Sequence, residues 1–156
     1  MEYETATFAA GCFWGVEAKF RKLDGVVDTM VGYTGGHVKD PDYRLVCTDT
    51  TGHAEAVQIQ FDPEKISYQQ LVETFYQVHN PTTPNRQGPD FGSQYRSAIF
   101  YHTDAQKEIA ETVTAFVDSS GEFKHPVVTE IKPASIFYKA EEYHQRYYEK
   151  HGLFHC

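Results

Sequence analysis

Apolar and polar residues follow patterns that predict a strand and then a helix at the start of the chain. Thr5–Ala10 is an apolar run typical of a strand, and Gly11 ends it. Between Phe13 and Leu23 the apolar residues recur at helical spacing, and Gly25 follows where a helix would stop. This strand–turn–helix order is the first unit of a mixed α and β arrangement.

Similar patterns predict the later elements. Two capping-box sequences mark helix starts, Ser67 with Gln70 and Thr103 with Gln106. The predicted strands are Val26–Tyr33, Val57–Phe61, Ser97–Tyr101, Val127–Ile131 and Ser135–Tyr138, and a polar helix is predicted at Glu141–Lys150. Residues 37–53 and 80–95 carry no periodic pattern, and long loops in compact domains are often functional.

The order of these elements is β-α-β, loop, β-α, loop, β-α-β-α. It predicts one α+β domain over residues 1–156, in which residues 152–156 are a short C-terminal tail. The first six elements match the split β-α-β plan of ferredoxin-like folds.

The charge balance narrows the range of partners. The chain has 14 Lys and Arg against 22 Asp and Glu, a formal net charge of −8. This argues against nucleic acid and anionic lipid as partners, because both bind through cations. The longest uncharged run, Thr5–Val16, has 12 residues, too few to span a membrane. The acidic start Met1–Glu4 lacks a signal-peptide pattern, so we expect a cytoplasmic location.

The most informative motif is Gly11-Cys12-Phe13-Trp14-Gly15. It places Cys12 where the predicted helix begins, and the free N–H groups of a helix start stabilise a thiolate. Cys12 is therefore placed to act as a nucleophile. The aromatic side chains of Phe13 and Trp14 suit a small apolar group such as a methyl or thioether. A buried structural cysteine would produce the same pattern.

Other polar residues are candidates for the same site. Glu55 joins a long loop to a strand among apolar neighbours, where a carboxyl group can stay protonated and donate its proton. Asp90 and Tyr95 lie in the second long loop and Tyr43 in the first, and neutral tyrosine hydroxyls can hold a substrate oxygen. Each of the four could equally be an ordinary surface or core residue.

Two further cysteines could react with Cys12. Cys156 can bridge to it only if the tail folds over the site, because bridged Cα atoms lie within about 7 Å; Cys47 competes for the same role. His151, His155 and Cys156 are close in sequence, but the chain has neither a CxxC pair nor an HExxH motif, so we expect no metal. No nucleotide-binding motif is present, and we expect no cofactor.

Together these segments resemble the A-type peptide methionine sulfoxide reductases from about Phe8 to Cys156. The resembling segments are Gly11–Gly15, Gly32–Gly36, Tyr43 ahead of Cys47, Gly52–Val57, Phe61–Pro63 and Gln94–Ser97. The resemblance implies a ferredoxin-like α/β sandwich with long loops around the active site. It also implies a thiol-dependent oxidoreductase that acts on the S epimer of methionine sulfoxide, free or within oxidised proteins.

The resemblance further implies roles for the candidate residues. Cys12 matches the nucleophile that attacks the sulfoxide sulfur, becoming a sulfenic acid, and Glu55 matches the acid that protonates the oxygen. The substrate-binding matches are Phe13 and Trp14 for the methyl pocket, Tyr43 and Tyr95 for the oxygen, and Asp90 as a supporting carboxylate. A second thiol then forms a disulfide that thioredoxin, the usual reductant of the family, reduces.

The chain departs from the family at two places. Many members end in a glycine-rich tail with recycling cysteines, whereas this chain ends at Leu153-Phe154-His155-Cys156. Cys156 is the first choice for the resolving thiol and Cys47 the second. Phe91 stands beside Asp90 where some members have histidine, which changes the polarity of the site. Nothing in the sequence requires more than a monomer.

Three other functions remain open. A thiol peroxidase would use Cys12, but the apolar Phe13-Trp14 pair argues against peroxide, which needs polar contacts. A methionine-binding module would keep the aromatic pocket and need neither Cys12 nor Glu55. A metal-binding protein would use His151, His155 and Cys156, and its zinc content would reveal it.

Overall fold

The computed structural model describes residues 3–151 and is built on a six-stranded mixed sheet with the strand order β7-β6-β1-β3-β2-β8. Its strands are β1 Glu4–Ala10, β2 Val26–Thr34, β3 Ala54–Phe61, β6 Ser97–Tyr101, β7 Glu130–Pro133 and β8 Tyr138–Lys139. The helices are α1 Phe13–Arg21, α2 Tyr43–Val46, α3 Tyr68–Gln77, α4 Asp104–Ser119 and α5 Tyr147–His151. A small hairpin pairs β4 Arg86–Gln87 with β5 Asp90–Phe91, and two 3-10 turns cover Ser93–Tyr95 and Glu142–His144.

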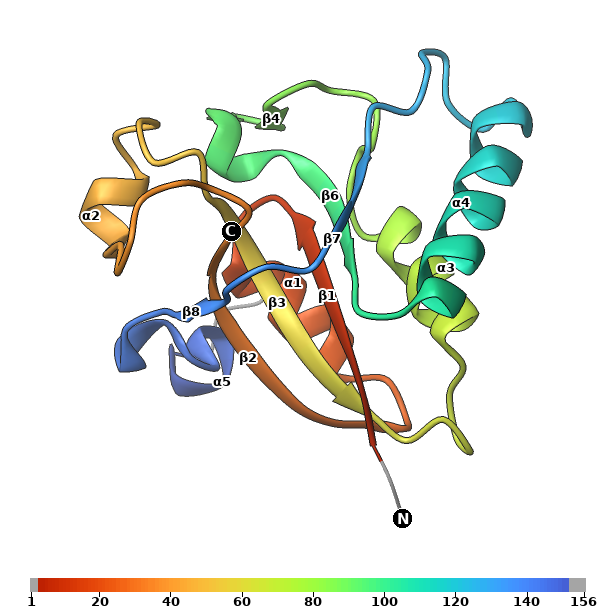
Figure 1. Ribbon diagram of the computed structural model, residues 1–156, viewed down its shortest axis with the longest axis horizontal. Coiled ribbons are helices and arrows are strands. Elements are labelled where there is room, and N and C mark those ends of the chain that lie inside the picture. The colour runs from red at the N-terminus through yellow and green to blue at the C-terminus, as the bar shows by residue number, and fades with distance from the viewer. Residues whose placement is uncertain (1–2, 152–156) are drawn as a thin grey trace.

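The four central strands have the ferredoxin-like order that the sequence predicted. β1 pairs antiparallel with both β3 and β6, and β2 pairs antiparallel with β3. Helix α1 connects β1 to β2, which lie on either side of β3 in the sheet, and helix α3 lies in the connection from β3 to β6, which lie on either side of β1 (Figure 1). The predicted α+β class is confirmed, with β7 and β8 added at opposite edges.

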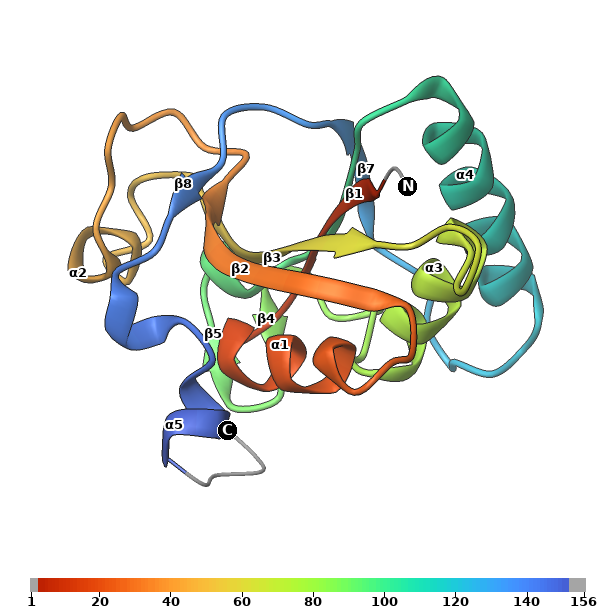
Figure 2. The same cartoon turned by 90° about the horizontal axis from the view of Figure 1, so that it is seen from below.

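The main core lies between the sheet and helices α1 and α3. Phe8 of β1 stacks on Phe20 of α1 at 5.4 Å between ring centroids and on Phe75 of α3 at 5.3 Å. All three rings are almost fully buried. Figure 2 shows α1 running along one side of the sheet, below β2 and β3. The core therefore holds the N-terminus of α1 in a fixed place against the end of β1.

The opposite face of the sheet is crossed by the segment that joins β7 to β8 (Figure 1). This face carries small side chains, including Ala9, Ala54 and Ala56, which leave room for Phe137 to pack on it. Gly32 of β2 is required here because an added Cβ would lie 2.6 Å from the Phe137 ring. The small residues thus allow the C-terminal part of the chain to reach the β2 edge.

The helix capping predictions are confirmed at both positions, with one difference. Ser67 accepts from the backbone N–H of Gln70, and the Gln70 side chain accepts from the Ser67 N–H, a complete capping box. Thr103 accepts from the Gln106 N–H in the same way, but the Gln106 side chain accepts from His102, one residue earlier. The second helix start is therefore capped by a variant of the predicted pattern.

The predicted polar helix at Glu141–Lys150 is wrong. A 3-10 turn covers Glu142–His144, Arg146 has a φ of +52°, and only then does α5 begin. The cause is Gln145, whose buried side chain accepts from the Val31 N–H and donates to the Val31 carbonyl. These two bonds act like an extra rung of the sheet, and a continuous helix could not make them.

The predicted strands near the C-terminus are shorter than expected. Val127–Ile131 becomes a strand only from Glu130, because the Val128 N–H is bonded to the Pro81 carbonyl in the second long loop. Ser135–Tyr138 is a strand only at its end. The first long loop contains the short helix α2, begun by Asp42, whose carboxylate accepts from the Leu45 N–H at 2.8 Å. Four helical residues are too few to produce a periodic pattern.

Candidate active site

Cys12 lies between β1 and α1 as the N-cap residue of that helix. Gly11 precedes it with a φ of +99°, and an added Cβ there would lie 2.6 Å from Cγ of Gln87. The chain can therefore turn from strand to helix only with glycine at this position. Cys12 is half-buried at the positive end of a nine-residue helix, an environment that lowers the energy of a thiolate.

Glu55 reaches the same helix start from the sheet. Its side chain is 1% exposed, and Oε1 accepts from the backbone N–H of Phe13 at 3.2 Å. Glu55 lies on β3, which pairs with β1, so the sheet brings the carboxyl group beside the strand that precedes Cys12. The nucleophile and the acid that the sequence proposed thus meet at one helix terminus.

His53 fixes the loop that leads into β3. Its Nδ1 accepts from the Gly36 N–H at 3.0 Å, so the ring proton lies on Nε2, which donates to the Val38 carbonyl at 2.7 Å. The ring is 2% exposed. A neutral histidine therefore ties together both sides of the long loop, two residues before Glu55.

Tyr43 and Tyr95 come from the two long loops and face a shared acidic environment. Burial raises the pKa of each hydroxyl, and the nearby Glu55 and Cys47 raise it further. Both tyrosines consequently stay protonated around neutral pH. They can donate hydrogen bonds to a substrate oxygen without adding charge, as the sequence proposed.

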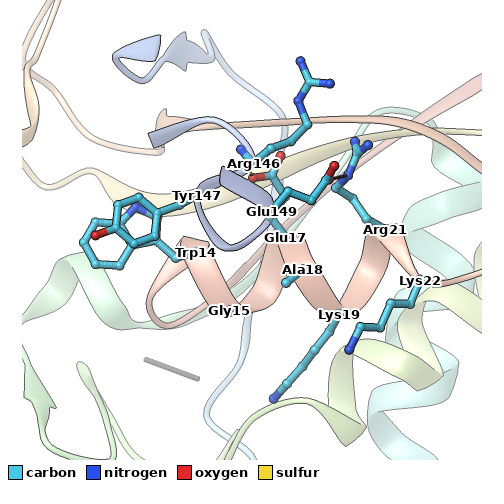
Figure 3. A pocket seen from close by; sticks show the side chains of 10 residues that line it. All are labelled: Trp14, Gly15, Glu17, Ala18, Lys19, Arg21, Lys22, Arg146, Tyr147 and Glu149. Atoms are coloured by element: carbon cyan, nitrogen blue, oxygen red, sulfur yellow. Dashed lines mark hydrogen bonds and ion pairs between the residues drawn. The ribbon is translucent and has the colours of Figure 1, made fainter. Parts of the chain in front are cut away.

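The aromatic residues after Cys12 have different surroundings. Phe13 is buried, with its ring centroid 5.8 Å from that of Tyr33 and 6.4 Å from that of Tyr43. Trp14 is half-buried and stacks on Tyr147 of α5, with ring centroids 3.9 Å apart. Figure 3 shows the two rings in face-to-face contact. One face of the Trp14 indole is therefore covered by Tyr147 of the C-terminal helix.

Asp90 shares a cavity with Cys12. The cavity has a volume of about 230 Å³, and Gln87 also lines it, so the loop that carries Asp90 packs directly on the turn at Gly11. The neighbouring Phe91 is 68% exposed, with the Arg86 guanidinium 4.9 Å from its ring centroid. The described part of the chain therefore places Asp90, and not Phe91, in the cavity beside the thiol.

Two residues of the C-terminal segment support the site and were missed by the sequence analysis. Glu141 accepts from the Tyr43 N–H through Oε2 and from the Tyr33 hydroxyl through Oε1, at 3.0 and 2.9 Å. His144 is fully buried, and its Nδ1 accepts from the indole N–H of Trp14 at 2.9 Å. The polar pattern around them predicts only an exposed helix, so no local signal in the sequence identifies either residue.

Loss of Glu141 should loosen Tyr43. We expect Glu141→Ala to lower kcat/KM for the sulfoxide substrate that the resemblance implies about tenfold, mainly through KM, because the bonds from the Tyr43 N–H and the Tyr33 hydroxyl to a charged acceptor are lost. Glu141→Gln should recover part of this loss, since its amide oxygen still accepts a bond. Steady-state kinetics of both variants tests the prediction, and wild-type KM values in Glu141→Ala would contradict it.

Glu141 also carries a pH dependence. Burial raises its pKa, but the hydrogen bonds from the Tyr43 N–H, its own N–H and the Tyr33 hydroxyl, together with the nearby His144, outweigh burial, and the net pKa is lowered. Its ionised form therefore stabilises the fold above the ordinary glutamate pKa, and this contribution is lost as pH falls through the lowered value. The Tm of wild type should therefore exceed that of Glu141→Gln at neutral pH, and this difference should shrink as the pH falls through the lowered pKa of Glu141.

Of the two other cysteines, Cys47 lies within the described residues and Cys156 does not. Cys47 follows α2, and the residue as a whole is exposed. Partial removal of its thiol from water raises the pKa of that thiol, a hydrogen bond with Tyr43 opposes the rise, and the charges of Glu55 and Glu141 reinforce it. Cys156 lies outside the described residues, as do the side chains of His151 and His155. The metal hypothesis on His151, His155 and Cys156 is therefore untested, and residues 3–151 contain no group of three potential metal ligands.

The described helices also bear on membranes. No helix among residues 3–151 combines the length and the apolar character needed to cross a bilayer.

Comparisons with known proteins agree on one family. Residues 4–156 match the family model described as peptide methionine sulfoxide reductase. The peptide methionine sulfoxide reductase MsrA of Methanosarcina mazei is 60% identical over 150 residues, which cover 96% of this chain and 71% of that protein. Mxr1 of Saccharomyces cerevisiae in reduced form superposes with a TM-score of 0.90 at 38% identity, covering 99% of this chain and 89% of Mxr1. A second Mxr1 structure, in complex with Trx2, has a TM-score of 0.64 at 31% identity, with 94% and 85% of the two chains covered.

Proposed function

The chain belongs to the peptide methionine sulfoxide reductase family and is an oxidoreductase acting on methionine sulfoxide, and from this premise we propose that Cys12 attacks the S epimer with Glu55 as the acid. One observation carries the proposal. The Glu55 carboxyl accepts from the first N–H of the helix that Cys12 begins, so an acid and a thiol share one helix terminus.

The first step transfers the oxygen atom from the sulfoxide sulfur to the Cys12 sulfur through a transient bond between the two sulfurs. The Cys12 thiolate attacks the sulfoxide sulfur while a proton from Glu55 goes to the oxygen, because an unprotonated sulfoxide oxygen leaves poorly. Tyr43 and Tyr95 hold this oxygen as neutral donors, supported by their raised pKa values. The protonated oxygen then moves as a hydroxyl from the substrate sulfur to the Cys12 sulfur while the transient bond between the two sulfurs breaks. Methionine departs and Cys12 is left as a sulfenic acid, so the substrate is reduced and the cysteine oxidised.

The second step regenerates the thiol. We assign Cys156 as the thiol that condenses with the sulfenic acid, releasing water and forming a disulfide. Cys47 is the second candidate, and its raised pKa lowers the thiolate fraction that this thiol has available. Thioredoxin then reduces the disulfide by thiol exchange, a step that the similarity to Mxr1 in complex with Trx2 supports.

A single-turnover experiment tests the reaction. Reduced enzyme is mixed with separate S and R epimers of methionine sulfoxide, methionine is quantified, and intact mass is taken afterwards. We expect methionine from the S epimer alone and a loss of about two mass units, as a disulfide requires. A stable gain of one oxygen would reject the second thiol, and no methionine from either epimer would reject the reaction.

The resolving cysteine can be identified with paired variants. Cys156→Ser should release about one methionine per enzyme and then stop when thioredoxin is the reductant, because no intramolecular disulfide can form. Cys47→Ser is the matched control and should cycle as wild type does. Arrest in Cys47→Ser together with cycling in Cys156→Ser would reverse the assignment.

A further inference from the structure

A second cavity lies next to the Cys12 cavity, between helices α1 and α5. We call it the α1–α5 groove; it has a volume of about 370 Å³ and is lined by Trp14, Lys19, Lys22, Arg146, Tyr147 and Glu149, among others. Gly15 and Lys19 line this groove and the Cys12 cavity alike. The two cavities are therefore adjacent across one turn of α1.

The acidic residues of the groove are already engaged by other groups. Glu17 is 1% exposed, and its carboxylate accepts from the Thr29 hydroxyl and from the Arg146 N–H, both at 2.7 Å. Glu149 forms an ion pair with Arg21 at 2.5 Å. Neither carboxylate is available to neutralise a cation elsewhere in the groove.

The lysines of the groove are not neutralised within residues 3–151. Lys19 and Lys22 are exposed and form no ion pair there, and Lys19 makes only a 3.4 Å contact with the Val78 carbonyl. Figure 3 shows both side chains extending the same way from α1, while Arg21 turns toward Glu149. A chain with a net charge of −8 thus presents a local positive surface beside its reactive thiol.

We propose that the α1–α5 groove binds acidic residues that flank methionine sulfoxide in a polypeptide substrate. The inference rests on the proposed function, since it requires the sulfoxide to sit at Cys12. A side chain that enters the Cys12 cavity leaves its own backbone outside, and the groove is the adjoining hollow. Uncompensated lysines attract carboxylates and repel cations, and in a net acidic protein they offset the general repulsion of an acidic substrate.

Helix geometry sets the spacing of the acidic residues. Trp14, which is proposed to bound the pocket for the substrate methyl group, is taken as the reference point for the oxidised residue. Lys19 and Lys22 follow Trp14 by five and eight residues, or about 7.5 and 12 Å along the helix. An extended peptide advances about 3.3 Å per residue, so these distances correspond to roughly two to four residues from the methionine sulfoxide. The groove therefore selects for carboxylates at that separation, on one side of the oxidised residue.

The test compares synthetic peptides that differ only in charge. Each carries one S-methionine sulfoxide and two Glu, Gln or Lys residues about two and four positions before or after it, with dithiothreitol as the reductant. With the charged residues on one side of the methionine sulfoxide, either before or after it, kcat/KM for the Glu peptide should exceed that for the Gln peptide about three- to tenfold, as two exposed ion pairs allow. The kcat/KM for the Lys peptide should be lower than that for the Gln peptide. The preference should weaken at high salt.

Variants locate the effect. Lys22→Glu should remove or invert the preference, whereas Lys124→Glu, in the segment between α4 and β7 and outside the groove, should keep it with the same change in net charge. Turnover of free methionine sulfoxide by each variant is the reference. The preference is the ratio of the kcat/KM values of two peptides measured with the same enzyme, so a general loss of folding or activity in a variant does not change it.

Three results would overturn the inference: equal kcat/KM for all peptides, an unchanged preference in Lys22→Glu, or a Lys22→Glu effect confined to the KM for thioredoxin. The last would make the groove a docking surface for the reductant. Failure of the proposed function looks different, because wild-type enzyme would then produce no methionine from the free sulfoxide either.

Discussion

Replacing Cys12 by serine is expected to abolish methionine formation, lowering the rate by more than about 10³-fold. A hydroxyl at the start of α1 keeps the shape of the turn but is not ionised at neutral pH, so no nucleophile attacks the sulfoxide sulfur. Methionine is measured by chromatography with dithiothreitol as the reductant, so that neither thioredoxin nor the second thiol limits the rate.

Two controls make the Cys12→Ser result decisive. Cys47→Ser removes a thiol that does not lie at the start of α1 and should retain single-turnover methionine formation. Circular dichroism should show the same fold in both variants, because Cys12 contributes only a half-buried side chain. Methionine formation at the wild-type rate by Cys12→Ser would exclude it as the nucleophile.

Replacing Glu55 by glutamine is expected to slow the first chemical step about 10²- to 10⁴-fold, the usual contribution of a positioned general acid. The amide oxygen of glutamine can still accept the bond from the Phe13 N–H, so the geometry is preserved while the transferable proton is lost. Rapid-quench measurement of methionine in a single turnover isolates this step from regeneration of the thiol.

The kinetic pattern of Glu55→Gln distinguishes acid catalysis from a structural role. A general acid acts in the transition state, so kcat should fall while the KM for the sulfoxide changes little. A structural role would instead raise KM and lower Tm, since Glu55 is buried between β3 and α1. An unchanged single-turnover rate would remove Glu55 from the mechanism.

The parts of the fold that sequence patterns predicted well are those with local causes. The helical spacing after Phe13, the glycine at position 11 and the Ser67 capping box each depend on residues within one or two turns. The parts that were wrong depend on distant partners. Gln145 breaks the predicted C-terminal helix by bonding to Val31, 114 residues earlier, and no local pattern carries that information.

The candidate site divides in the same way. Cys12 and Glu55 stand in motifs whose local structure indicated a thiol at a helix start and a carboxyl group at a strand start, and the sheet then brought them together. Glu141 and His144 gave no such signal, because their importance comes from the Tyr43 N–H and the Trp14 indole that they contact. The charge of the α1–α5 groove likewise emerges only when α5 packs beside α1.

The sequence by itself determined the alternation of strands and helices, the thiol at the start of α1 and the family to which this reductase belongs, because these follow from residue order and spacing. Only the tertiary structure decided that the C-terminal segment packs along the β2 edge, covers Trp14 with Tyr147 and holds Tyr43 through Glu141. The physical reason is that such contacts form between residues about 100 or more apart, and they depend on side chains meeting in space.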